Sequence, residues 1–171
     1  LYRGEAAADA KPVALTDHRG PDGDLIALSH DGRIAWTGFD ETLPRRSSTT
    51  TRLYATTLAA GGLAAITNVT AGFDRNIGET AMSDVPLPRG SGTRLQFDAS
   101  GRALWFVAAD RGLPPHYRVS TAGGAPVSVS AQLRGDLREF SLARTGRIVA
   151  VFGSPTQPYD IWTLERPSGK W

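Results

Sequence analysis

The chain has 171 residues, is 40% hydrophobic and 21% charged, and carries a formal net charge of +2, which is compatible with one domain that buries a core. It contains no cysteine, which excludes disulfides, thiolate catalysis and cysteine-based metal sites. No basic run exceeds the pair Arg45-Arg46, and the longest apolar run, Leu58–Ile66, is far shorter than the roughly 20 residues of a membrane-spanning helix, so we expect neither nucleic-acid binding nor membrane insertion.

Residues 1–16 are predicted to form the last two strands of a blade-like unit. A turn-forming segment follows at Asp17–Gly23. Because the sequence begins at Leu1 inside such a strand and without methionine, we expect a fragment of a longer protein and leave its compartment undecided. A second unit is predicted over 24–68, with a tight turn at His30–Gly32 and a longer loop at Asp40–Thr51.

A complete unit is predicted over residues 93–130, after the long connection Val69–Gly92. Its four short runs of β-branched and aromatic residues are Thr93–Phe97, Ala103–Ala108, His116–Ser120 and Pro126–Ser130. Four strands of about five residues joined by glycine-containing turns indicate an antiparallel meander. The last unit, incomplete or terminal, is predicted over 137–164.

The units repeat the same signals. A glycine lies in the turn after each first strand and is followed by an arginine and an apolar strand, at Gly32, Gly101 and Gly146. An aromatic residue holds the same place in each third strand, at Tyr54, Tyr117 and Trp162, and the last two are 45 residues apart (162 − 117).

A period of about 40–50 residues with four strands per unit is typical of β-propellers. A β-sandwich is the alternative, but its Greek-key order would not repeat one hairpin. The sequence therefore predicts an all-β fold, a partial β-propeller of about three to four four-stranded antiparallel blades.

Four segments carry a resemblance to a known family: Ser29–Thr37 (SHDGRIAWT), Thr51–Tyr54 (TRLY), Phe73–Ile77 (FDRNI) and Ser154–Ile161 (SPTQPYDI). They are similar to blades of the propeller domain in serine peptidases of the prolyl-oligopeptidase family, especially its bacterial acylaminoacyl-peptidase-like and dipeptidyl-peptidase-like members. The family usually has Ser-Pro-Asp-Gly where this chain has Ser-His-Asp-Gly. Single blade motifs are shared with other propellers, including the Tol-system type.

The resemblance implies a propeller that caps an α/β-hydrolase domain with a Ser-Asp-His triad. The expected function is therefore a non-catalytic segment that gates or positions a peptide substrate for a hydrolase domain outside this chain, in a parent protein that is a serine peptidase. The alternative is a stand-alone propeller used as a protein-binding scaffold, of the Tol type or the WD-repeat type.

No catalytic residue is predicted in the chain, because the Gly-x-Ser-x-Gly turn of a hydrolase nucleophile does not occur. The three histidines, His18, His30 and His116, are expected to be solvated or to support turns. We expect no metal and no cofactor, because spaced histidine ligands are missing and the aspartates near residue 20 lack the spacing of a calcium loop.

Strand direction predicts which end of the blades carries function. The short turns lie at one end, whereas the long insertions Asp40–Thr51 and Val69–Gly92 lie at the other. Expanded loops on a rigid scaffold usually carry binding, although tolerated polar insertions are the alternative. We expect this end to contact peptide substrate, a catalytic domain or another subunit, with Arg45, Arg46 and Arg75 as carboxylate partners.

The exposed strand edges at Leu1–Gly4 and Asp160–Leu164 are expected to pair with another chain, as in a homo-oligomer, or with missing parts of the parent protein, because unpaired edges template further pairing.

Overall fold

The computed structural model describes residues 2–3, 9–15, 25–39, 49–59, 62–78 and 94–164. These residues form strands and no helix. The strands are β1 (Tyr2–Arg3), β2 (Val13–Ala14), β3 (Ile26–Leu28), β4 (Arg33–Phe39), β5 (Thr51–Ala59), β6 (Gly62–Leu63), β7 (Thr67–Asn68), β8 (Leu95–Phe97), β9 (Ala103–Val107), β10 (His116–Ser120), β11 (Val127–Ser128), β12 (Asp136–Leu142), β13 (Ile148–Ser154) and β14 (Gln157–Leu164). No helix in the described ranges is long and apolar enough to cross a lipid bilayer.

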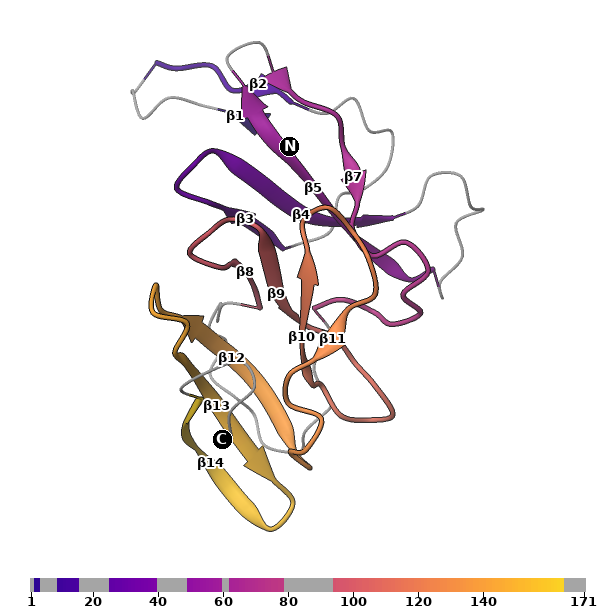
Figure 1. Cartoon of the computed structure of the whole chain (residues 1–171), viewed down its shortest axis with the longest axis vertical. Coiled ribbons are helices and arrows are strands. Elements are labelled where there is room, and N and C mark those ends of the chain that lie inside the picture. Colours follow the sequence, from indigo (N-terminus) through magenta and orange to yellow (C-terminus); the bar gives the residue numbers. More distant parts are fainter. Residues whose placement is uncertain are drawn as a thin grey trace.

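The strands form four sheets that follow the sequence. Sheet 1 pairs β1 with β2; sheet 2 has the order β3-β4-β5, with β6 and β7 both pairing with β5; sheet 3 has the order β8-β9-β10-β11; and sheet 4 has the order β12-β13-β14. Neighbouring strands are antiparallel throughout. Sheets 2, 3 and 4 succeed one another along the long axis (Figure 1). The predicted all-β class and its antiparallel meanders are confirmed.

The first hairpin of sheets 2, 3 and 4 uses one turn geometry. Gly32, Gly101 and Gly146 have φ values of 82°, 66° and 84°, a region that only glycine adopts without strain. Each glycine N–H donates to the carbonyl three residues earlier. The glycines repeat in the sequence because this backbone conformation repeats in the structure.

Sheet 3 departs from the sequence pattern by one residue in this turn. The N–H that opens the hairpin donates to Arg33 O in sheet 2 and to Arg147 O in sheet 4, but to Ala103 O in sheet 3. Arg102 is therefore an additional turn residue, and Ala103 takes the place of the two arginines. The repeated glycine-arginine signal suggests that Arg102 is equivalent to Arg33 and Arg147, and this equivalence is wrong. The three arginines share their distance from the glycine but not their place in the hairpin.

The aromatic residues of the third strands nonetheless occupy equivalent positions in their sheets, once the additional turn residue Arg102 is taken into account. Tyr54 lies opposite Trp36 and Tyr117 lies opposite Phe106, at the same register of their sheets. The first pair stacks with ring centroids 5.8 Å apart and the second with centroids 5.7 Å apart. Cross-strand aromatic pairs of this kind stabilise a sheet beyond the area they bury.

The fourth strand of sheet 2 is interrupted. The sequence predicts one strand over 64–68, whereas the structure has β6 before it and β7 at its end. Thr56 Oγ1 donates to the carbonyls of Ala64 and Ala65 at 3.0 and 3.1 Å, so a side chain of β5 holds the segment where the ladder is broken.

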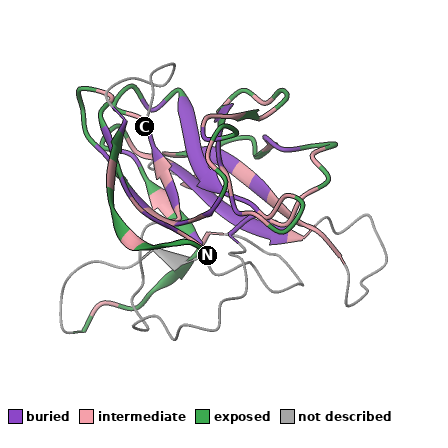
Figure 2. Cartoon of the chain, turned by 90° about the horizontal axis from the view of Figure 1, so that it is seen from below, coloured by how far each residue is buried: buried purple, intermediate pink, exposed green. Residues whose placement is uncertain are grey.

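Two apolar interfaces hold the sheets together, and sheet 3 contributes to both. One joins it to sheet 2 and includes Leu25, Ala35, Leu53, Ala55, Val69, Ile77, Leu95, Phe97, Leu104, Phe106, Ala108, Tyr117 and Val119. The other joins it to sheet 4 and includes Trp105, Val107, Leu137, Phe140, Leu142, Ile148, Ala150, Phe152 and Leu164. Figure 2 shows the buried residues on the strands and the exposed ones mainly along the turns and outer strands.

The start of the connection after sheet 2 is packed rather than exposed. Val69 and Thr70 are 0% exposed and Ile77 is 4% exposed. The Leu53 N–H donates to Thr70 Oγ1 at 2.8 Å, and the Phe73 ring lies edge-on to Tyr117 with centroids 5.0 Å apart. The two ends of the segment 69–78 are therefore anchored in the core between sheets 2 and 3, whereas Ala71, Gly72 and Asp74 are exposed. Residues 79–93 lie outside the described ranges.

Candidate binding site

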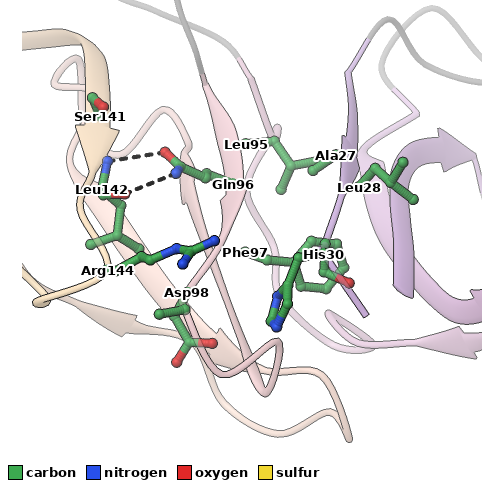
Figure 3. A pocket seen from close by; sticks show the side chains of 12 residues that line it. Ala27, Leu28, His30, Leu95, Gln96, Phe97, Asp98, Ser141, Leu142 and Arg144 are labelled. Carbon is green, nitrogen blue, oxygen red and sulfur yellow. Dashed lines mark hydrogen bonds between the residues drawn. The ribbon is translucent and has the colours of Figure 1, made fainter. Parts of the chain in front are cut away.

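The first strands of sheets 2, 3 and 4 meet at the end of the molecule that carries the short turns. A hollow of about 380 Å³ lies there between β3, β8, β12 and their turns (Figure 3). Its lining consists of Ala27, Leu28, Ser29, His30, Leu95, Gln96, Phe97, Asp98, Ala99, Ser141, Leu142 and Arg144. The site thus draws on segments more than one hundred residues apart in the sequence.

One glutamine joins two of these strands. Gln96 Nε2 donates to Leu142 O, and the Leu142 N–H donates to Gln96 Oε1, both at 3.0 Å. The side-chain amide thus behaves like a backbone peptide and fixes β8 against β12 at one wall of the hollow, as the dashed lines in Figure 3 show.

Replacing Gln96 with Met should lower the free energy of unfolding by about 1–2 kcal/mol, because two partly buried backbone groups lose their partner. Urea denaturation measures the change. Gln157→Met is the matched control, since Gln157 is exposed and its side chain makes no hydrogen bond within the described part of the chain. Equal midpoints for the two variants would contradict a joining role for Gln96.

The acidic residues near the hollow are held by their own turns. Asp98 Oδ1 accepts hydrogen bonds from the N–H groups of Arg102 and Ala103 at 3.0 and 3.2 Å. The hydrogen bond from Ser29, and then the charge of Arg33, hold the pKa of the Asp31 carboxyl below its usual value. Arg33 Nη1 also donates to Gly101 O at 2.8 Å, which ties the turn of sheet 2 to that of sheet 3.

Arg144 is the charged side chain of the lining that remains available to a ligand. The Arg144 side chain extends over the hollow from the β12–β13 turn (Figure 3), and within the described residues it makes no hydrogen bond or ion pair. Leu28 is 67% exposed and points away from the hollow, whereas Ala27 of the same strand points toward Leu95 (Figure 3). His30 is exposed at the rim. The arrangement offers a cation, the exposed backbone of the turns, and an apolar lining that includes Ala27 and Phe97.

Two further hollows flank the first at the same end of the sheets. One of about 480 Å³ lies between sheets 3 and 4 and includes Trp105, Arg118 and Arg144. The other, of about 290 Å³, lies between sheets 2 and 3 and includes Arg33, Thr56 and Phe97. These three hollows are not predicted from the sequence, because the long insertions, at the other end of the strands, are the features that suggest binding.

Of the arginines predicted to bind, only Arg75 lies within the described residues; Arg45 and Arg46 lie outside them. Arg75 Nε donates to Asp110 Oδ1 at 2.9 Å, and the Tyr117 hydroxyl donates to Asp110 Oδ2 at 3.1 Å. Burial, followed by the charge of Asp110, raises the pKa of Tyr117 to about 12. Arg75 therefore already has a carboxylate partner within the chain.

The structure places the histidines in different environments. His116 is 1% exposed and packs on Phe140 with ring centroids 4.8 Å apart, so the expectation of a solvated or turn-supporting side chain is wrong for this residue. Burial lowers its pKa to about 3. His30 is exposed, and His18 lies outside the described residues. No group of metal-ligating side chains that could hold an ion occurs in the described ranges.

No protein-family model and no curated protein sequence matches the chain. Solved structures do match. A TolB protein from Agrobacterium tumefaciens aligns over 93% of this chain and 50% of its own, with a TM-score of 0.59 and 13% identity. The AtxE2 isopeptidase, in a variant bound to Astexin3-dC4, aligns over 94% of this chain and 22% of its own, with a TM-score of 0.58 and 20% identity.

A third solved structure is itself a propeller domain. The β-propeller domain of the Trilobed protease from Pyrococcus furiosus aligns over 91% of this chain and 38% of its own, with a TM-score of 0.54 and 13% identity. This chain thus spans about half of the TolB protein, and less of the other two. At such identities the similarity concerns the fold alone: the chain has the fold of a partial β-propeller.

Proposed function

We propose that the chain is a non-catalytic propeller segment of a serine peptidase of the prolyl-oligopeptidase type, which positions peptide substrate for an α/β-hydrolase domain outside this chain. Two considerations support it. Peptidases occur among the proteins of similar fold, including a puromycin-hydrolysing peptidase from Mycobacterium tuberculosis with a TM-score of 0.56 and 17% identity. The sequence itself lacks the nucleophile turn of a hydrolase.

The observation that carries the proposal is the hollow where β3, β8 and β12 meet. An extended peptide ends in a carboxylate and carries apolar side chains. Arg144 supplies a guanidinium for the carboxylate, and Ala27 of β3 supplies an apolar contact across the hollow. Binding sites usually combine an apolar surface with a few polar groups that fix the orientation of the ligand.

The end with the long insertions keeps a proposed role as the contact with a hydrolase domain or another subunit. Arg45 and Arg46 would pair there with carboxylates of the partner. Arg75 would contribute through the outer part of its guanidinium, because its side chain is 36% exposed while its Nε is bound to Asp110.

The peptide site is tested with the chain itself. Short peptides with a free C-terminal carboxylate should bind, and Arg144→Ala should weaken binding at least about tenfold, because a charge-assisted hydrogen bond contributes roughly 1.5–3 kcal/mol. Isothermal titration calorimetry measures both. Arg134→Ala is the matched control, since Arg134 is exposed, lies outside the hollow and makes no hydrogen bond or ion pair within the described residues. The wild type should bind amidated peptides as weakly as the Arg144→Ala variant binds peptides with a free carboxylate. Equal affinities of the wild type and the Arg144→Ala variant for both kinds of peptide would contradict the site.

The peptidase assignment has a separate test, which is the coding sequence that follows Trp171. A Gly-x-Ser-x-Gly motif downstream, with labelling of the full protein by a fluorophosphonate, supports it. The scaffold alternative is favoured by the similarity to the TolB protein, of which the chain covers 50%. A stop codon after Trp171 would favour this alternative and overturn the peptidase assignment.

A further inference from the structure

The groove between sheets 2 and 3 and the groove between sheets 3 and 4 differ in charge. At the end with the short turns they open as hollows of about 290 Å³ and about 480 Å³. Arg33 is the charged side chain of the smaller hollow, and it is bound within the chain. Its Nε lies 3.1 Å from Asp31 Oδ2, and its Nη1 donates to Gly101 O at 2.8 Å. The cation of the smaller hollow is therefore neutralised by its own turn.

The larger hollow has two arginines that are not neutralised in this way. Arg118 lies on β10 and Arg144 lies in the β12–β13 turn, and both are exposed. Within the described residues neither side chain makes a hydrogen bond or an ion pair. Asp98 also lines this hollow, but its Oδ1 accepts from two N–H groups of its own turn. The hollow therefore carries two available cations beside one carboxylate that is already engaged.

The register of sheet 3 places Arg118 on the face that packs against sheet 4. Arg118 lies opposite Trp105, which is 2% exposed and belongs to the apolar interface with sheet 4. Directly opposed residues of an antiparallel pair project to the same face of a sheet. At the same register of sheet 2, Ala55 lies opposite Ala35, and both are buried in the interface with sheet 3. Sheet 3 thus has an arginine where sheet 2 has a small apolar side chain.

The turn that carries Arg144 differs from the first turns of the other two sheets. Asp31 pairs with Arg33 in the turn of sheet 2, and Asp98 holds the turn of sheet 3. The turn of sheet 4, residues 143–147, contains no acidic residue. Arg144 therefore has no carboxylate partner in its own turn.

The larger hollow adjoins the proposed peptide site. Asp98, Ala99, Leu142 and Arg144 line both hollows. An extended peptide advances roughly 3.3–3.6 Å per residue, so a peptide whose C-terminal carboxylate lies at Arg144 places its last side chains beside the larger hollow. Arg118 is the available cation there.

We propose that Arg118 selects acidic peptides, by pairing with a glutamate side chain close to the C-terminus while the C-terminal carboxylate pairs with Arg144. The inference rests on the proposed peptide site and adds the class of substrate. Guanidinium groups suit this role because they bind carboxylates through two parallel hydrogen bonds. Trp105 and Leu142 line the same hollow and offer an apolar surface to the methylene groups of the glutamate.

Pairs of short peptides with a free C-terminal carboxylate test the proposal, with Glu or Gln at the last position or at the one before it. At one of these positions the wild type should bind the Glu peptide about fivefold more tightly, which is the size expected of a solvent-accessible ion pair. Isothermal titration calorimetry measures the affinities. Arg118→Gln should abolish the preference and leave the affinity for the Gln peptide unchanged.

Arg102→Gln is the matched control and should keep the preference for Glu. Arg102 is exposed in the β8–β9 turn and lines neither hollow, and within the described residues its side chain makes no hydrogen bond or ion pair. Charge reversal adds a result that a structural role of Arg118 would not give. Arg118→Glu should prefer a peptide with Lys at the selected position to the Glu peptide, and near-ultraviolet circular dichroism verifies that the variants are folded.

The outcomes separate this inference from the peptide site on which it rests. Glu and Gln peptides that bind the wild type equally, with binding that depends on Arg144, would overturn the role of Arg118 and leave the peptide site intact. A preference for Glu that persists in Arg118→Gln would overturn that role as well. If the wild type binds none of the peptides, both the peptide site and the inference fail.

Discussion

Acidification from about pH 8 to about pH 5 should lower the free energy of unfolding by about 2 kcal/mol through His116 alone. Burial lowers the pKa of this histidine from 6.5 to about 3 in the folded chain. Between these two values the unfolded chain binds a proton that the folded chain does not. Stability is therefore unaffected by His116 above pH 6.5 and falls progressively as the pH drops toward about 3.

His116→Leu should remove this pH dependence. Leu53 occupies the same register in sheet 2 and is 0% exposed, so leucine suits the position. Urea denaturation at both pH values measures the loss, and His30→Gln is the control because His30 is exposed. If the His116→Leu variant kept the acid sensitivity of the wild type, the loss would have to come from other groups.

Local features of the fold were predictable because they depend on neighbours in the sequence. The glycine of each first hairpin needs a positive φ, and a short run rich in apolar residues lies on either side of it, so turn and hairpin follow from a few residues. The interruption between β6 and β7 was not predictable, since it depends on Thr56 in a preceding strand. The extra residue Arg102 could be recognised only from the hydrogen bond between Asp98 and Ala103.

The candidate site was not predictable because it lies between sheets. Ala27, Gln96 and Arg144 meet in the hollow only through the packing of three sheets, and no spacing in the sequence reports that packing. Arg75 shows the same limit, since Asp110 is 35 residues away and takes its Nε. The signal that could have indicated the hollow is the repeat itself, which places the first hairpins of all units at one end.

His116 was misjudged for a related reason. It follows two prolines at the start of a strand, which is a position that the sequence associates with a turn. His116 is buried by the neighbouring sheet, because Phe140 of sheet 4 packs on its ring. The aromatic residues of the third strands were easier to interpret, because their cross-strand partners lie within the same hairpin.

A second large effect is expected from a largely buried ion pair at the start of sheet 4. Arg138 Nε donates to Asp136 Oδ2 at 2.5 Å, and both side chains are 12% exposed. The Tyr159 hydroxyl donates to the same Asp136 oxygen at 2.7 Å, and the guanidinium lies 4.9 Å from the centroid of the Tyr159 ring. Asp136 Oδ1 and Arg138 Nη2 are buried and have no hydrogen-bond partner among the residues that the structure describes.

Either single substitution, Asp136→Leu or Arg138→Met, should lower the free energy of unfolding by about 3–5 kcal/mol, because it leaves the other charge buried and unpaired. The double variant should lose much less than the sum, and less than either single variant, because it removes both desolvation penalties together with the unsatisfied atoms. The double-mutant cycle therefore separates the value of the pair from the cost of breaking it.

Chemical denaturation of the four proteins gives the coupling free energy, which we expect to exceed about 2 kcal/mol in magnitude. The comparison pair is Asp31 and Arg33, whose side chains are 37% and 34% exposed at an N–O distance of 3.1 Å. Water screens that pair, so its coupling should stay within about 1 kcal/mol. Additive losses at Asp136 and Arg138, no larger than those at Asp31 and Arg33, would mean that water reaches the cluster and that the first strand of sheet 4 is less tightly packed than its burial indicates.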